Sequence, residues 1–188
     1  MRAQRRCRRT AVPVAILALG LGAGCSTPPG PDDTAPVADG AADRSNVGPA
    51  ADAARKSALD AYAGYLAASR EAERSADPLH PELKKYLADP LLTRVRLAIR
   101  DAKEHGAMRT GTLRSDPTVT EVNLDAVPPT VAIQDCLDAT GYRLVYRKTK
   151  AVVPGSENGR FLATATATRY PDGRWLISAG AAHPDQPC

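Results

Sequence analysis

The sequence predicts an α+β domain in which N-terminal helices pack on a curved antiparallel sheet. Between residues 49 and 106, apolar residues recur at spacings of three and four, which is the period of a helix. From residue 108 onward, runs rich in β-branched residues alternate with segments containing Pro, Gly and Asp. Because helices and strands fall in two successive blocks, the order favours α+β over alternating βαβ units. Residues 49–188 suit one domain with one core.

Residues 1–24 have the pattern of an export signal. A cationic head precedes the apolar run from Ala11 to Leu21. The uncharged stretch 10–24 would measure about 22 Å as a helix, which is too short for roughly 30 Å of hydrocarbon. We therefore expect residues 1–24 to be removed rather than to span a membrane. The head contains Arg2, Arg5, Arg6, Arg8 and Arg9.

The segment from Leu21 to Cys25, "LGAGC", resembles a bacterial lipobox, with Gly22 where such motifs usually carry a branched apolar residue. The resemblance implies that the sulfur of Cys25 is lipidated and that Cys25 becomes the first residue of the mature protein. Two acyl chains hold a protein on a membrane where one chain is marginal. We therefore expect an extracytoplasmic protein that is lipid-anchored to the outer face of the cell membrane.

Residues 25–48 form a predicted disordered tether. The segment is rich in Pro, Gly, Asp and Ala and offers little apolar surface to bury. As a flexible coil it has a root-mean-square reach of about 25 Å. We expect it to act as a spacer between the anchor and the domain at 49–188.

Removal of the signal changes the charge of the protein. The whole chain has 25 Lys and Arg against 21 Asp and Glu, but five of those Arg precede Cys25, which leaves 20 against 21. Nucleic-acid binding depends on clustered cations that neutralise phosphates. The mature chain therefore gives no support for a nucleic-acid partner.

Three helices are expected before the first strand. The first covers about residues 50–74 with Pro49 at its start, and its apolar face continues along the helix to Ser69. The second opens at Pro81. The third has Asp89 as its cap and ends at Gly106. The buried positions are expected at Ala58, Leu59, Tyr62, Tyr65 and Leu66 in the first helix, at Leu83, Tyr86 and Leu87 in the second, and at Leu92, Val95, Ile99 and Ala102 in the third.

The second half of the domain contains six strand signals. They are separated by turn residues, among them the Pro171-Asp172-Gly173 turn. Alternation is clearest in 161–168, where Phe and Ala take one face while Leu and Thr take the other. The expected strands lie at 108–115, 118–124, 130–137, 142–148, 160–170 and 174–181.

Four segments carry a family resemblance: "ADPLHPELKKYLADPLL", "GTLRSDPTVTEVNL", "AIQDCLDATGYRLV" and "ATATATRYPDGRWLI". In order and spacing they resemble secreted proteins and lipoproteins of actinobacteria whose domains are similar to the nuclear transport factor 2-like, or cystatin-like, cone. Tyr142 stands where many such relatives have Trp. The resemblance implies a fold and an extracytoplasmic location, and it implies no established activity.

The cysteines divide into two groups. Cys7 leaves with the signal and Cys25 takes the lipid, so Cys136 and Cys188 remain. In an oxidising compartment such a pair most simply forms a disulfide, which the chain-entropy model values at on the order of 4 kcal/mol for a loop of this length. The pairing also resembles the Asp-Cys and terminal-Cys pattern of the family.

Catalytic and metal sites have weaker support. Cys136 could be a nucleophile with His183 as base and Asp135 or Asp138 as orienting group, but a disulfide would consume its sulfur. The histidines, at 80, 105 and 183, are isolated from one another and no metal-ligand spacing occurs. We expect no catalytic residue, no metal and no cofactor.

A cone fold can hold a pocket between its sheet and its helix. Glu121 and Asp135 are the carboxylates that strand alternation could turn inward as a general base, although each is more often a solvated strand residue. The inward positions of 161–167 are mainly Ala, which offers no acid or base. Small side chains there leave room for a small apolar ligand or allow close helix packing, and the sequence does not separate the two.

The segment "YRLVYRKTK" at 142–150 concentrates cations between two tyrosines. It is interpreted either as a patch for anionic lipid headgroups or wall polymers, or as an edge strand protected by charge against pairing with another chain. We favour the edge strand. The cations are Arg143, Arg147, Lys148 and Lys150.

The function expected from the sequence is that of a membrane-anchored cell-envelope lipoprotein whose domain binds or supports another envelope protein without catalysis. The first alternative is a lipid-tethered binder of a small apolar ligand. The second is an enzyme of the isomerase or dehydratase kind.

Overall fold

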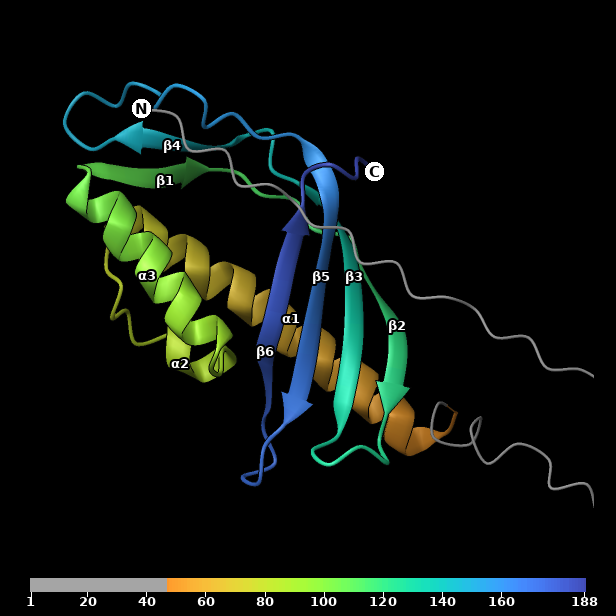
Figure 1. The fold of residues 1–188 in the computed structure, drawn as a ribbon. Helices are drawn as coiled ribbons and strands as arrows, with labels where there is room; N and C mark the ends of the chain where they lie inside the picture. The colour runs from red at the N-terminus through yellow and green to blue at the C-terminus, as the bar shows by residue number, and fades with distance from the viewer. Residues whose placement is uncertain (1–46) are drawn as a thin grey trace, which may run out of the picture. The chain divides into compact units, whose positions relative to one another are not determined.

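The computed structural model describes residues 47–188 (Figure 1). The predictions for the signal at 1–24, the lipidation of Cys25 and the tether up to residue 46 lie outside the described residues. Within 47–188, no helix combines the length and the apolar character that a membrane crossing requires. The described part is an α+β fold of helices and antiparallel sheets, as the sequence predicts.

Three helices come first in the chain. The long helix begins at the predicted proline, which has no N–H to leave unpaired in a first turn. It ends where Ala76 takes a left-handed conformation with φ 51°, and the N–H of Asp77 then donates to the carbonyl of Ala72. The helices are α1 (Pro49–Ser75), α2 (Leu83–Tyr86) and α3 (Leu91–Glu104).

Asp89, the predicted cap of the third helix, lies one residue before the observed cap position, and its side chain contacts the first turn. The Asp89 carboxylate accepts hydrogen bonds from the N–H of Thr93 at 3.1 Å and from the Thr93 hydroxyl at 2.6 Å. Because Pro90 occupies the cap position, the helix itself starts one residue later than the sequence suggests. Its buried face includes Leu92 and Ile99.

The strands form two separate antiparallel sheets. A two-stranded ribbon pairs β1 with β4, and a four-stranded sheet has the order β2-β3-β5-β6. The single curved sheet expected from the sequence is therefore divided, because neither β1 nor β4 pairs with a strand of the four-stranded sheet. The strands are β1 (Ala107–Gly111), β2 (Pro117–Asn123), β3 (Thr130–Asp138), β4 (Tyr142–Tyr146), β5 (Arg160–Arg169) and β6 (Trp175–His183).

The predicted alternation in β5 is present, with Ala163, Ala165 and Ala167 buried. A register shift between Thr166 and Ala167 then interrupts it, so that Thr168 is buried as well. The Thr168 hydroxyl is paired with the Ser178 hydroxyl at 2.7 Å. A second register shift interrupts β2 before Glu121.

The core lies where α1 crosses the four-stranded sheet (Figure 1). Alanines on α1 meet small and β-branched side chains on the strands, which allows helix and sheet to pack closely. Beyond the sheet, the C-terminal part of α1 reaches the β1–β4 ribbon and lies near α3. The principal core residues are Ala51, Ala54, Ala58, Tyr62, Leu83, Leu87, Ile99, Val122, Val131, Ile133, Ala165, Ala167 and Ile177.

The predicted disulfide is present between Cys136 and Cys188. It ties the C-terminal segment to β3, and the N–H of Leu162 on β5 donates to the carbonyl of Gln186 at 2.8 Å. Two contacts therefore hold this segment against the sheet.

Candidate functional site

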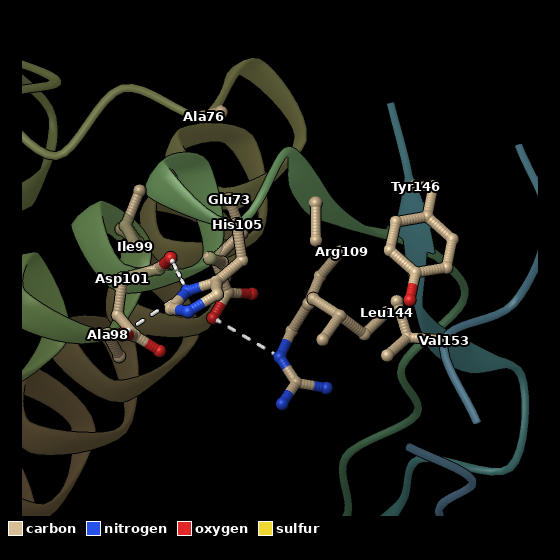
Figure 2. A pocket seen from close by; sticks show the side chains of 12 residues that line it. Glu73, Ala76, Ala98, Ile99, Asp101, His105, Arg109, Leu144, Tyr146 and Val153 are labelled. Carbon is tan, nitrogen blue, oxygen red and sulfur yellow. Dashed lines mark hydrogen bonds and ion pairs between the residues drawn. The ribbon is translucent and has the colours of Figure 1, made fainter. Parts of the chain in front are cut away.

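A cleft of about 540 Å³ lies where the C-terminal end of α1, α3 and the β1–β4 ribbon meet. Figure 2 shows α3 side chains on one side and β4 side chains on the other, with Arg109 of β1 between them. The larger part of the wall is apolar, and five of the lining side chains carry polar groups. The lining residues are Glu73, Ala76, Ala98, Ile99, Asp101, Ala102, His105, Ala107, Arg109, Leu144, Tyr146 and Val153.

Glu73 is the carboxylate at the inner wall of the cleft. It occupies the last turn of α1, and its side chain is 22% exposed. The phenol of Tyr142 on β4 donates a hydrogen bond to Oε2, and Nε of Arg109 on β1 lies 4.0 Å from Oε1. Both strands of the ribbon therefore supply a partner to one helix carboxylate.

The surroundings of Glu73 act on its pKa in opposite directions. Burial raises the pKa above the ordinary value of 4.5, and this is the largest cause, while the Tyr142 hydrogen bond and the Arg109 charge lower it. The pKa of Tyr142 is raised by burial and by the Glu73 carboxylate, so its hydroxyl stays protonated and donates. The result is a half-buried carboxylate that is held in place yet not fully solvated.

The rim of the cleft carries a second polar pair at the end of α3. Nδ1 of His105 lies 2.8 Å from the carbonyl oxygen of Asp101 and 3.5 Å from its Oδ1. Both side chains are largely exposed. The polar groups are the exposed pair at the end of α3, Glu73 with Arg109, and Tyr146, whereas Ile99, Leu144 and Val153 provide apolar surface. This distribution suits a ligand that is mainly apolar.

Asp135 corrects an expectation. The sequence favours a solvated side chain, yet Asp135 is 1% exposed. Its carboxylate accepts from the hydroxyls of Tyr62 at 3.0 Å and Ser115 at 2.7 Å and from the N–H of Asp116 at 2.7 Å. Burial and then the Asp135 charge raise the pKa of Tyr62, which keeps its proton and donates. Asp135 is therefore a satisfied structural carboxylate that joins α1, β3 and the segment before β2.

The other sequence candidates are dispersed. Glu121 is exposed, because the β2 register shift places it opposite Ala132. The sulfur of Cys136 lies in the disulfide, so the nucleophile hypothesis for this residue is wrong. His183 contacts Thr164 on the neighbouring strand, with 3.1 Å between Nε2 and Oγ1.

The histidines lie in three different parts of the described fold: His80 between α1 and α2, His105 at the cleft and His183 on β6. Within residues 47–188, His, Cys, Asp and Glu side chains form no cluster of three that could hold a metal.

The cationic segment is not an open edge strand, which was the interpretation the sequence favoured. One side of β4 pairs with β1, and the other side meets residues 151–153. There the N–H of Tyr146 donates to the carbonyl of Ala151, and the N–H of Val153 donates to that of Leu144, both at 2.9 Å. The charges on 147–150 are thus not needed to block strand pairing along 144–146.

A second hollow, of about 470 Å³, crosses the four-stranded sheet. Its polar lining is provided by strand side chains, and Arg94 of α3 lies at its border, where Nη2 donates to the carbonyl of Gly180 at 3.1 Å. The polar strand side chains are Thr120, Gln134, Thr164 and Thr166.

Sequence reasoning missed Glu73 and Arg109. A signal for Glu73 existed: the apolar face of α1 continues from Tyr62 through Leu66 and Ser69 at helical spacing, and Glu73 is the next position on it. A carboxylate at a buried position of a helix is unusual. Arg109 gave no signal, because its role depends on the pairing of β1 with β4.

Comparisons with known proteins add little. No protein-family model and no curated protein matches the chain. Among solved structures, the intermembrane space region of chloroplast protein ARC6 is similar with a TM-score of 0.46 and 12% sequence identity, over 69% of this chain and 96% of that chain. A similarity at this level carries no argument about function.

Proposed function

We propose that the protein is a lipid-anchored protein of the cell envelope that binds a small, largely apolar molecule in the cleft at Glu73 and has no catalytic role. The observation that carries the proposal is the cleft itself. Its volume of about 540 Å³ falls within the range of small-molecule sites, and apolar walls surround a few fixed polar groups. This favours a small ligand over the envelope-protein partner expected from the sequence.

The absence of catalysis is supported by what the candidate groups do. Asp135 is enclosed and saturated by three donors, and Cys136 is bonded to Cys188. Glu73 is paired with Arg109 and Tyr142, so its carboxylate already has two partners within the protein.

We also propose that the domain is a cone of the nuclear transport factor 2-like or cystatin-like kind. The support is a long helix lying across one face of an antiparallel sheet (Figure 1). In this proposal Cys25 carries the acyl anchor at the outer face of the membrane. Cys25→Ser should move the protein from the membrane fraction to uncleaved precursor or the medium, and unchanged anchoring would contradict the lipid anchor.

The cleft is tested with 1-N-phenylnaphthylamine, an uncharged fluorophore that brightens in apolar surroundings. The full chain carrying Cys25→Ser should bind it, and Ala102→Trp should abolish binding by filling the cleft. Ala98→Trp, at an exposed lining position, should weaken binding too.

Ala53→Trp is the matched control, because Ala53 is exposed on α1 about 30 Å along the helix from Glu73. Thermal unfolding shows that each variant is folded. Equal binding by the Ala53, Ala98 and Ala102 variants would refute the cleft as the ligand site.

A further inference from the structure

Three cations are concentrated in one turn beside the cleft. The cationic turn, residues 147–150, contains Arg147, Lys148 and Lys150, all exposed. The N–H of Arg147 donates to the carbonyl of Gly106 and that of Lys150 to the carbonyl of Tyr146, both at 2.8 Å. The backbone thus fixes the turn against the end of α3 and β4, while its charged side chains extend into solvent.

The charges of the cationic turn are uncompensated. Within residues 47–188, no carboxylate forms an ion pair with Arg147, Lys148 or Lys150. The chain after the predicted signal has almost equal numbers of acidic and basic residues. Three unpaired cations in four residues therefore create a local positive field on a nearly neutral protein. Because residues 151–153 already cover the β4 edge, protection of that edge does not account for them.

The cationic turn adjoins the cleft. It lines a hollow together with Met108, His105 and Tyr146, and the last two of these also line the Glu73 cleft. The hollow and the cleft therefore border each other across His105 and Tyr146. One molecule can therefore contact both the apolar walls of the cleft and the cationic turn.

From this juxtaposition we propose that the ligand is an anionic amphiphile, a lipid-like molecule with a phosphate group at one end. Its apolar part enters the cleft and its phosphate binds the cationic turn. The inference rests on the proposed function, which assigns a small apolar ligand to the cleft, and adds the chemical class of that ligand.

The carboxylates of the cleft determine the orientation. The cleft also contains one cation, Arg109, but it faces Glu73 at 4.0 Å, and Asp101 at the rim adds a second carboxylate, so the cleft offers an anion no excess of positive charge. An anionic end is favoured outside, at the turn, where three ammonium and guanidinium groups supply donors for phosphate oxygens. The ligand therefore buries its apolar end in the cleft and keeps its phosphate end outside, at the cationic turn.

The experiment compares two competitors with the same alkyl chain, dodecyl phosphate and 1-dodecanol. Each is used to displace 1-N-phenylnaphthylamine from the full-length protein carrying Cys25→Ser. We expect dodecyl phosphate to bind about ten-fold to hundred-fold more tightly at about 50 mM salt, with the preference shrinking at about 300 mM. Replacement of all three cations, by Arg147→Gln, Lys148→Gln and Lys150→Gln, should reduce the preference to within about two-fold while leaving fluorophore binding intact.

The matched control replaces three exposed cations elsewhere, by Lys56→Gln, Lys84→Gln and Arg169→Gln, and should keep the preference. Equal affinity for the phosphate and the alcohol would overturn the inference, and fluorophore binding that still depends on Ala102 would leave the proposed function standing. Failure of every variant to bind the fluorophore would instead refute the proposed function.

Two further arms distinguish sources of the phosphate. Inorganic phosphate should compete only weakly, because it lacks the apolar part; displacement as strong as that by dodecyl phosphate would overturn the amphiphile. Phosphatidylglycerol vesicles test surface docking. If the Ala102→Trp variant binds dodecyl phosphate or these vesicles as well as the parent does, the turn recognises an anionic surface without the cleft, and the inference is wrong.

Discussion

Two tyrosine–carboxylate pairs lie against α1, and they differ in how completely they are enclosed. At the middle of the helix, Tyr62 donates to Asp135, which is 1% exposed and has two further donors. At its C-terminal end, Tyr142 donates to Glu73, which is 22% exposed and borders a cleft. The four-stranded sheet covers the first pair, whereas the two-stranded ribbon covers the second only in part. We infer that the first pair serves the fold and the second serves binding.

The largest predicted effect on stability is that of Asp135. Asp135→Ala would leave the buried Tyr62 hydroxyl, the Ser115 hydroxyl and the Asp116 N–H without their acceptor, so we expect a loss of about 3–5 kcal/mol in the free energy of unfolding, measured by urea denaturation. Glu121→Ala, at an exposed carboxylate of the adjacent strand, is the control and should change it by less than about 0.5 kcal/mol. Equal effects would mean that Asp135 is not the structural carboxylate described here.

The second effect in size concerns the disulfide, which lies one residue from Asp135 on β3. The double change Cys136→Ser and Cys188→Ser should lower the free energy of unfolding by about 2–4 kcal/mol, because the cysteines are 52 positions apart and the bond restricts the unfolded chain. Fluorophore binding in the cleft should remain, since neither cysteine lines it. Loss of binding in a folded double variant would contradict the separation of the two regions.

The smallest predicted effect is the pH dependence that Glu73 gives to the free energy of unfolding. Burial raises the folded-state pKa of Glu73 above 4.5. At pH below 4.5 the side chain is protonated in both the folded and the unfolded state, so its ionisation does not lower the free energy of unfolding. As pH rises through the folded-state pKa, the free energy of unfolding of the wild type decreases, because the carboxyl group ionises more readily in the unfolded chain.

Glu73→Gln does not titrate and avoids this loss. The free energy of unfolding of Glu73→Gln minus that of the wild type should therefore increase from about pH 4 to about pH 8. A pH-independent difference, or one that decreases over this range, would show that Glu73 is not desolvated. Glu82→Gln, immediately before α2, provides a carboxylate control away from the cleft.

Sequence periodicity predicted the helices and strands well, because helix and strand periods are local properties of the chain. The contact of Asp89 with the first turn of α3 and the inward alanines of β5 followed from neighbours only a few residues away. The division into two sheets did not, since it depends on β1 pairing with β4 across more than thirty positions. Asp135 was recognised as a possible inward carboxylate, but its three donors come from distant segments.

The cleft was beyond sequence reasoning for the same reason. It is formed where α1, α3 and the ribbon meet, so no single segment contains its pattern. Glu73 could be recognised from the sequence, because it is a carboxylate on the buried face of α1. Arg109 and Val153 become lining residues only once the ribbon is folded against the helices.

The central claim, that the partly covered end of α1 is a binding site, is tested most directly by photolabelling. An alkyl photoprobe with a terminal diazirine is irradiated with the full chain, and the labelled residues are identified by peptide mass spectrometry. We predict label on the cleft walls at 98–107 and 144–153, with excess 1-dodecanol preventing it. Label confined to the threonine-lined hollow of the four-stranded sheet, or distributed evenly over the chain, would contradict it.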